Sequence, residues 1–149
     1  MAISPNTNFS AGQILTATQA NQWPRGIMAL ATRNTNFAPD TTISDFASVT
    51  FTAEANRYYK YSLFIPGADS SAALLIIILL TNAANADVNS FTQSLRGPGL
   101  LDTFTCVTVR TETAGSITRK IRMETTTGNA SMCSAGSIGY FLVEDIGPA

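Results

Sequence analysis

The sequence contains no histidine and few charged residues. Histidine is absent from all 149 residues, and Asp, Glu, Lys and Arg together make up only 13%. Without histidine the chain cannot form a Ser–His–Asp triad or any other His-dependent acid–base pair. The acidic residues stand singly except for Glu144 and Asp145, and strand neighbours point to opposite faces, so this pair makes a poor catalytic dyad. We expect no catalytic residues, no cofactor, no enzymatic activity, and solvent-exposed positions for Glu144 and Asp145.

Basic residues are as scarce as acidic ones. The chain has nine Lys and Arg residues, which are scattered, and its formal net charge is −1. Electrostatic capture of nucleic acid needs clustered Lys and Arg side chains. We therefore expect no binding to nucleic acid.

Cysteine is rare, and the start of the chain lacks the features of a secretion signal. Cys106 and Cys133 are the only thiols, and two thiols without histidine cannot supply a four-ligand zinc site. We expect both to be buried as small hydrophobic side chains, with a disulfide between neighbouring strands as the alternative. The first eight residues have no charged start and no apolar core. We expect the chain to be made and kept in a cytoplasm until something larger leaves the cell.

One long aliphatic run, from Leu74 to Leu80, interrupts this polar sequence. A membrane span needs roughly 20 apolar residues, far more than the run provides, so we expect no membrane insertion. A buried helix is a second alternative, but the run is short, rich in β-branched Ile, and followed by the polar break Asn82–Asp87. A strand shows alternate side chains to opposite sides, so both faces need cover. We predict a core strand whose outer face meets another chain or neighbouring loops, and its residues are Leu74, Leu75, Ile76, Ile77, Ile78, Leu79 and Leu80.

Most of the remaining chain alternates with a period of two, which is typical of half-buried strands. The pattern places Tyr59 and Tyr61 inward on one strand, whereas Pro66–Asp69 predicts a turn and Thr113–Gly115 a hairpin turn. Strands at this spacing predict an all-β fold, an antiparallel β-sandwich with a jelly roll as the best single description. The sandwich domain comprises residues 26–149, and the predicted strands cover 27–32, 43–54, 57–65, 74–80, 91–95, 101–111, 116–125 and 137–143.

Residues 1–25 form an irregular N-terminal arm with one short helix. Thr16 followed by Gln19 matches a capping box, and Pro24 ends the helix. A helix this short is unstable alone and must pack on something. It either folds back onto its own domain or docks on a partner or a sister subunit. The candidate docking residues are Phe9, Ile14, Leu15, Trp23 and Arg25.

Three tyrosines suggest sugar binding as an alternative function of the sheet. Tyr58, Tyr59 and Tyr61 would suit a sugar-binding surface if their rings were exposed. Aromatic residues at period two more often form core on one face and ordinary cover on the other. The glycan-binding interpretation therefore stays the alternative.

The stretch from Phe9 to Gly26 resembles the N-terminal pattern F-x-A-G-x-x-L-T-A-x-x-x-N-x-x-x-R-G of small structural proteins of tailed bacteriophages. Two further stretches are similar to the same group, Ala55–Tyr61 and the terminal Leu142–Pro148. The resemblance implies a virion structural protein rather than an enzyme.

Within the virion, the resemblance fits best a capsid decoration (cement) protein. Such a protein oligomerises, commonly as a homotrimer, and clamps neighbouring subunits of the major capsid protein. It would lie on the capsid exterior after assembly in the host cytoplasm. A tail-fibre or baseplate adaptor, or a receptor-binding (glycan-binding) head, is the alternative implied by the same resemblance.

Overall fold

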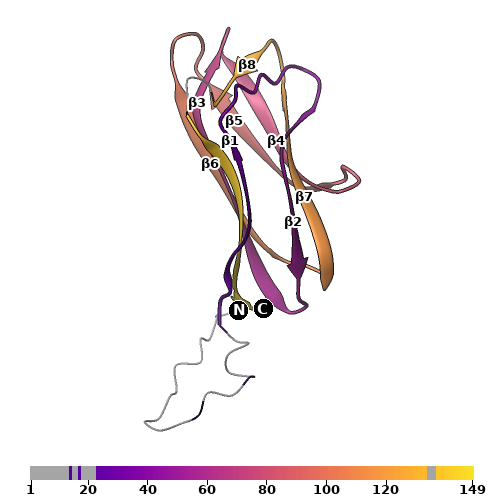
Figure 1. Cartoon of the computed structure of the whole chain (residues 1–149). Helices are drawn as coiled ribbons and strands as arrows, with labels where there is room; N and C mark the ends of the chain where they lie inside the picture. The colour runs from indigo at the N-terminus through magenta and orange to yellow at the C-terminus, as the bar shows by residue number, and fades with distance from the viewer. Residues whose placement is uncertain (1–13, 15–16, 18–22, 134–136) are drawn as a thin grey trace.

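The computed structural model describes residues 14, 17, 23–133 and 137–149, and it consists of two antiparallel sheets packed face to face (Figure 1). The sequence prediction of an all-β sandwich is confirmed. The short helix predicted around Thr16 to Gln19, and the docking residues Phe9 and Leu15, lie outside the described residues. The strands are β1 (Gly26–Arg33), β2 (Ser44–Ala53), β3 (Arg57–Ser70), β4 (Leu74–Asn82), β5 (Asp87–Leu95), β6 (Asp102–Thr111), β7 (Gly115–Thr125), β8 (Ala130–Ser131) and β9 (Gly139–Pro148).

The strand order is that of a jelly roll. The first sheet has the order β1-β9-β3-β6, and the second sheet has the order β2-β7-β4-β5. The two-residue strand β8 pairs only with the end of β3. With β8 set aside, the first strand pairs with the last, the second with the second-last, and so on inward to the β4–β5 hairpin. This nested pairing describes one long antiparallel ribbon wound into a sandwich, the arrangement of an eight-stranded jelly roll.

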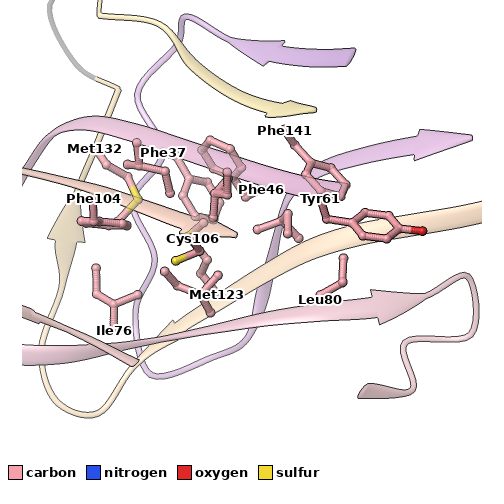
Figure 2. Packing of buried hydrophobic residues seen from close by; sticks show 14 of the residues in the cluster. Phe37, Phe46, Tyr61, Ile76, Leu80, Phe104, Cys106, Met123, Met132 and Phe141 are labelled. Atoms are coloured by element: carbon pink, nitrogen blue, oxygen red, sulfur yellow. The ribbon is translucent and has the colours of Figure 1, made fainter. Parts of the chain in front are cut away.

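The core lies between the two sheets, and both sheets contribute large side chains to it. Figure 2 shows Tyr61, Phe104, Cys106 and Phe141 together with side chains such as Ile76 from the second sheet. Edge-to-face and stacked ring pairs occur within this layer and add to the burial of apolar area. The fully buried side chains include Tyr59, Leu63, Ile65, Ile76, Ile78, Leu80, Met123, Met132, Phe141 and Val143.

The aliphatic run forms β4, a central strand between β7 and β5, as predicted. Its alternate residues Leu74, Ile76, Ile78 and Leu80 point into the core and are buried. The other three, Leu75, Ile77 and Leu79, lie on the outer face of the second sheet, where Leu75 is 41% exposed. The strand therefore has one face in the core and one at the surface of this chain.

Two predicted turns are wrong in detail. Pro66–Asp69 does not turn the chain, because β3 continues to Ser70 through a register shift between Ile65 and Ala68, where Gly67 adopts a φ of 61°. This bulge accommodates the proline and glycine without ending the strand. Thr113–Gly115 is a turn, but it joins β6 in the first sheet to β7 in the second, so it is not a hairpin.

Two predicted strands are longer in the structure than in the sequence pattern. β5 begins at Asp87 rather than Phe91, because Asn85 with a φ of 64° closes a tight turn directly after β4. β9 does not end at Val143 but runs to Pro148, paired along its length with β1 and β3. Neighbouring strands on both sides hold this charged segment in the sheet, which periodicity could not show.

We predict that Leu80→Ala lowers the free energy of unfolding by about 3 kcal/mol, whereas Leu75→Ala lowers it by less than about 1 kcal/mol. Both substitutions remove the same atoms from β4, but Leu80 is 1% exposed and leaves a cavity in the core. Urea unfolding of the two variants measures the difference. Equal losses would contradict the assignment of the inward and outward faces of β4.

Candidate interaction site

The arm joins the sandwich beside a buried ion pair between the first residue of β3 and the end of β9. Arg57 donates from Nε to Oδ2 of Asp145 over 2.5 Å and from Nη2 to Oδ1 over 2.8 Å. Arg57 is buried, and Asp145 is only 1% exposed. The predicted solvent exposure of Asp145 is therefore wrong, because this position of β9 faces inward and its charge is matched by Arg57. Glu144 faces outward, as expected, and pairs with Lys60 over 2.7 Å.

The same arginine holds the last part of the arm. Arg57 Nη2 also donates to the backbone oxygen of Trp23 over 2.6 Å. Two residues further on, Arg25 forms an ion pair with Glu54 at the end of β2. The hydrogen bond to Glu54 holds the pKa of Arg25 above its ordinary value. We call the segment 23–26 with Arg57, Asp145 and Glu54 the arm root.

The structure brings two of the predicted docking residues to the arm root. Trp23 and Arg25 lie there, with the Trp23 side chain exposed. Ile14, in the arm itself, is also exposed. The remaining two, Phe9 and Leu15, lie outside the described residues. The seven predicted β4 residues lie in the second sheet and contribute nothing to the arm root.

A second buried charge cluster lies at the β6–β7 connection. Glu112 accepts hydrogen bonds from Arg119 and, over 2.6 Å, from the hydroxyl of Tyr61. Arg110 lies 3.2 Å from the same carboxylate. Burial, followed by the bond to Glu112, raises the pKa of Tyr61, so its hydroxyl stays protonated and donates. The sequence carried one signal of this cluster, since Arg119 occupies an inward position of the β7 pattern and a buried charge requires a partner.

The buried charges form ion pairs within the sandwich, Arg57 with Asp145 and Arg119 with Glu112. Among the described residues, no group of three His, Cys, Asp or Glu side chains is placed to hold a metal ion. Cys106 and Cys133 are both free and buried, as the sequence indicated, and burial raises the pKa of each thiol.

The tyrosine surface considered for sugar binding does not exist as a continuous platform. Tyr59 and Tyr61 are buried in the core, so that only Tyr58 of these three lies on the outer face. A hollow of about 280 Å³ lies at the opposite end of the sandwich from the arm root, lined by residues such as Asp69, Ser71 and Asn129. No aromatic side chain is among the described residues that line it. The three tyrosines considered for sugar binding therefore do not form a shared surface.

The described part of the chain contains no helix long and apolar enough to cross a lipid bilayer.

No protein-family model and no curated protein matches the sequence. Solved structures do match the fold. The VP2 subviral particle of infectious bursal disease virus is similar with a TM-score of 0.54 and 14% identity, over 83% of this chain and 33% of that chain. The structure of the Gx strain of the same virus is similar with a TM-score of 0.51 and 14% identity, over 97% of this chain and 37% of that chain.

The similarity extends over only part of these viral chains, since the present chain spans about a third of their length. Tailspike protein 4 of bacteriophage CBA120 is less similar, with a TM-score of 0.38 and 14% identity over 80% of this chain and 19% of that chain. This value is too low to establish a shared fold. The chain thus has the fold of a domain found in a viral particle protein.

We predict that Arg57→Met and Asp145→Leu each lower the free energy of unfolding by about 3 to 5 kcal/mol, because each leaves a buried charge without its partner. The double variant should lose clearly less than the two single losses together, with a coupling of about 2 kcal/mol. Urea unfolding of the four proteins measures this cycle.

The matched control is the half-exposed pair Lys60–Glu144, which joins the same two strands. Lys60→Met should cost less than about 1 kcal/mol, because a solvated pair contributes little. An Arg57→Met variant as stable as Lys60→Met would refute the role given to the buried pair.

Proposed function

We propose that this chain is a virion structural protein that decorates the exterior of a capsid. In this proposal it self-associates and clamps neighbouring subunits of the major capsid protein, and its N-terminal arm makes the contact with the shell. The sequence stretches around Phe9–Gly26, Ala55–Tyr61 and Leu142–Pro148 support it, because they resemble small phage structural proteins. The jelly-roll fold shared with a domain of the VP2 subviral particle is consistent with it.

The observation that carries the proposal is the arm root. Residues 1–22 contain no Asp, Glu, Lys or Arg, and they precede a segment that is fixed to the sandwich through Trp23 and Arg25. The buried Arg57 binds the backbone of Trp23, so the arm leaves the sandwich from a fixed position. An uncharged arm that starts from a fixed position suits contact with the surface of another protein. It does not suit the binding of a charged ligand.

The composition of the arm also says which forces would bind it. Since residues 1–22 have no charged side chains, their contacts to a shell rest on apolar burial and hydrogen bonds. Apolar contacts are not screened by salt, whereas contacts between exposed charges are. Binding to shells should therefore persist at high ionic strength.

The alternative, a tail-fibre or baseplate adaptor or a glycan-binding head, has less support. The tyrosines that would have formed a sugar platform are divided between the core and the surface. The hollow at the far end is lined by small polar residues, and Asp69 there already accepts hydrogen bonds from the backbone of Ser70 and Gly99. We therefore favour the decoration function.

We predict that removal of residues 1–22 leaves a folded sandwich that no longer binds capsid shells. The cut spares the bond from Arg57 to Trp23, so the free energy of unfolding should change by less than about 0.5 kcal/mol. Co-sedimentation with purified shells that lack this protein, in low and high salt, measures the binding.

A point variant tests the same role without truncation. Ile14→Asp places a charge on an exposed apolar residue of the arm and should weaken binding to shells at least about tenfold. Gln13→Asp adds the same charge at a neighbouring polar position and is the matched control. A truncated protein that binds shells as tightly as the full chain would overturn the proposal for the arm.

A further inference from the structure

The outer face of the first sheet carries apolar side chains on all four of its strands, together with hydroxyl side chains on β1, β3 and β6. The registers of β1, β9, β3 and β6 place Leu30, Leu142, Ser62 and Val107 in one row that crosses the whole sheet. Leu30 is 54% exposed and Val107 is 48% exposed. We call this surface the apolar face, and its described apolar residues are Ile27, Leu30, Tyr58, Phe64, Val107, Val109, Tyr140, Leu142 and Ile146.

Charge is almost absent from the apolar face. In the part of this face formed by Tyr58–Phe64 and the residues paired with them, the outward charged side chains among the described residues are Lys60 and Glu144. These two form an ion pair with each other. The outer face of the second sheet differs, since it carries Asp45, Lys120, Arg122 and Glu124 around the exposed part of β4. A contiguous apolar patch on one side of a sandwich, with a polar opposite side, marks an interaction surface.

We propose that a second copy of this chain packs on the apolar face, sheet against sheet. The inference deepens the self-association in the proposed function, and it moves the contact from β4, where the sequence placed it, to the opposite sheet. The outward residues of β4 form only a narrow stripe between charged and hydroxyl side chains. The apolar face is wider and almost free of charge.

The size of the apolar face suits a stable dimer. Its strands have 8, 10, 14 and 10 residues. Every second side chain points outward, which gives about 20 residues, near the number that each partner contributes to a standard interface of about 800 Å² per side. The half-exposed side chains Leu30 and Val107, which lie on the two edge strands of this sheet, supply part of the apolar burial.

Its charge pattern suits a partner identical to itself. A two-fold contact brings the same patch of both copies together, so the patch must be complementary to itself. Lys60 and Glu144 lie side by side in one cross-strand row, with Ile27 and Val109 at its ends. Across a two-fold axis, each lysine can face the glutamate of the other copy or keep its own. Either pairing leaves no net charge buried, whereas a strongly charged partner would leave the apolar face unmatched.

The test is the mass of the full-length protein in solution, by light scattering coupled to gel filtration from about 1 to 100 µM. We expect a dimer for the natural sequence, in place of the homotrimer that the resemblance implied. Val107→Asp and Leu30→Asp should each raise the dissociation constant at least about 100-fold. In a two-fold dimer both copies carry the substitution, so two new charges enter the interface. Both positions are half exposed, and circular dichroism and thermal unfolding show whether the variants stay folded.

Leu75→Asp is the matched control, since it adds the same charge to an exposed Leu on the outer face of the other sheet. It should leave the dimer intact. A monomer at all concentrations, a trimer, or a dimer lost in Leu75→Asp but kept in Val107→Asp would overturn the inference. Shell binding by the arm is measured separately, so failure here is distinguishable from failure of the proposed function.

Discussion

The buried ion pair between Arg57 and Asp145 is the interaction on which the arrangement of this chain depends. It joins the start of β3 to the end of β9, which are the two central strands of the first sheet. Removing two charges from water is costly, and here bidentate geometry and an additional bond from the backbone of Gly147 to Asp145 offset that cost. The pair holds the end of β9 against the start of β3. Through the bond from Arg57 to Trp23, it also fixes the point at which the arm leaves the sandwich.

The two sheets of the sandwich have different outer faces. The nested pairing puts β1, β9, β3 and β6 in one sheet with an apolar outer face, and the charged outer positions of β2 and β7 in the other. The arm root sits where β1 begins and β9 ends (Figure 1). In the proposed function, shell contact through the arm and contact between copies through the apolar face would use separate parts of the chain. A protein that binds a shell and its own copies at the same time requires two separate surfaces.

Much of the fold could be predicted because buried residues alternate with more exposed ones along most of β2 and β3, and because the aliphatic run of β4 is short and rich in β-branched Ile. The bulge after Ile65 could not, since Pro66 and Gly67 carry the same signal whether a strand bends or ends. The extension of β9 was also hidden, because its charged residues are stabilised by Arg57 and Lys60 on a strand far away in sequence.

The candidate sites were predicted less well than the fold. Trp23 and Arg25 were predicted from the sequence as docking residues of the arm, and the structure places them at the arm root, whereas their docking role stays a prediction. Arg57 and Asp145 were missed because nothing local links residues so distant along the chain. The apolar face was missed for another reason. Val107 and Val109 alternate with Phe104 and Cys106 on β6, and periodicity alone does not say which set faces the core.

The measurement that tests the central claim most directly is cryo-electron microscopy of virions that contain this protein, with its copies located and counted. A decoration protein anchored by its arm predicts many copies spread over the outside of the shell. Each sandwich should have the arm root, marked by Trp23 and the end of β9, facing the capsid protein. A few copies confined to the tail, or sandwiches whose arm roots point away from the shell, would contradict the account.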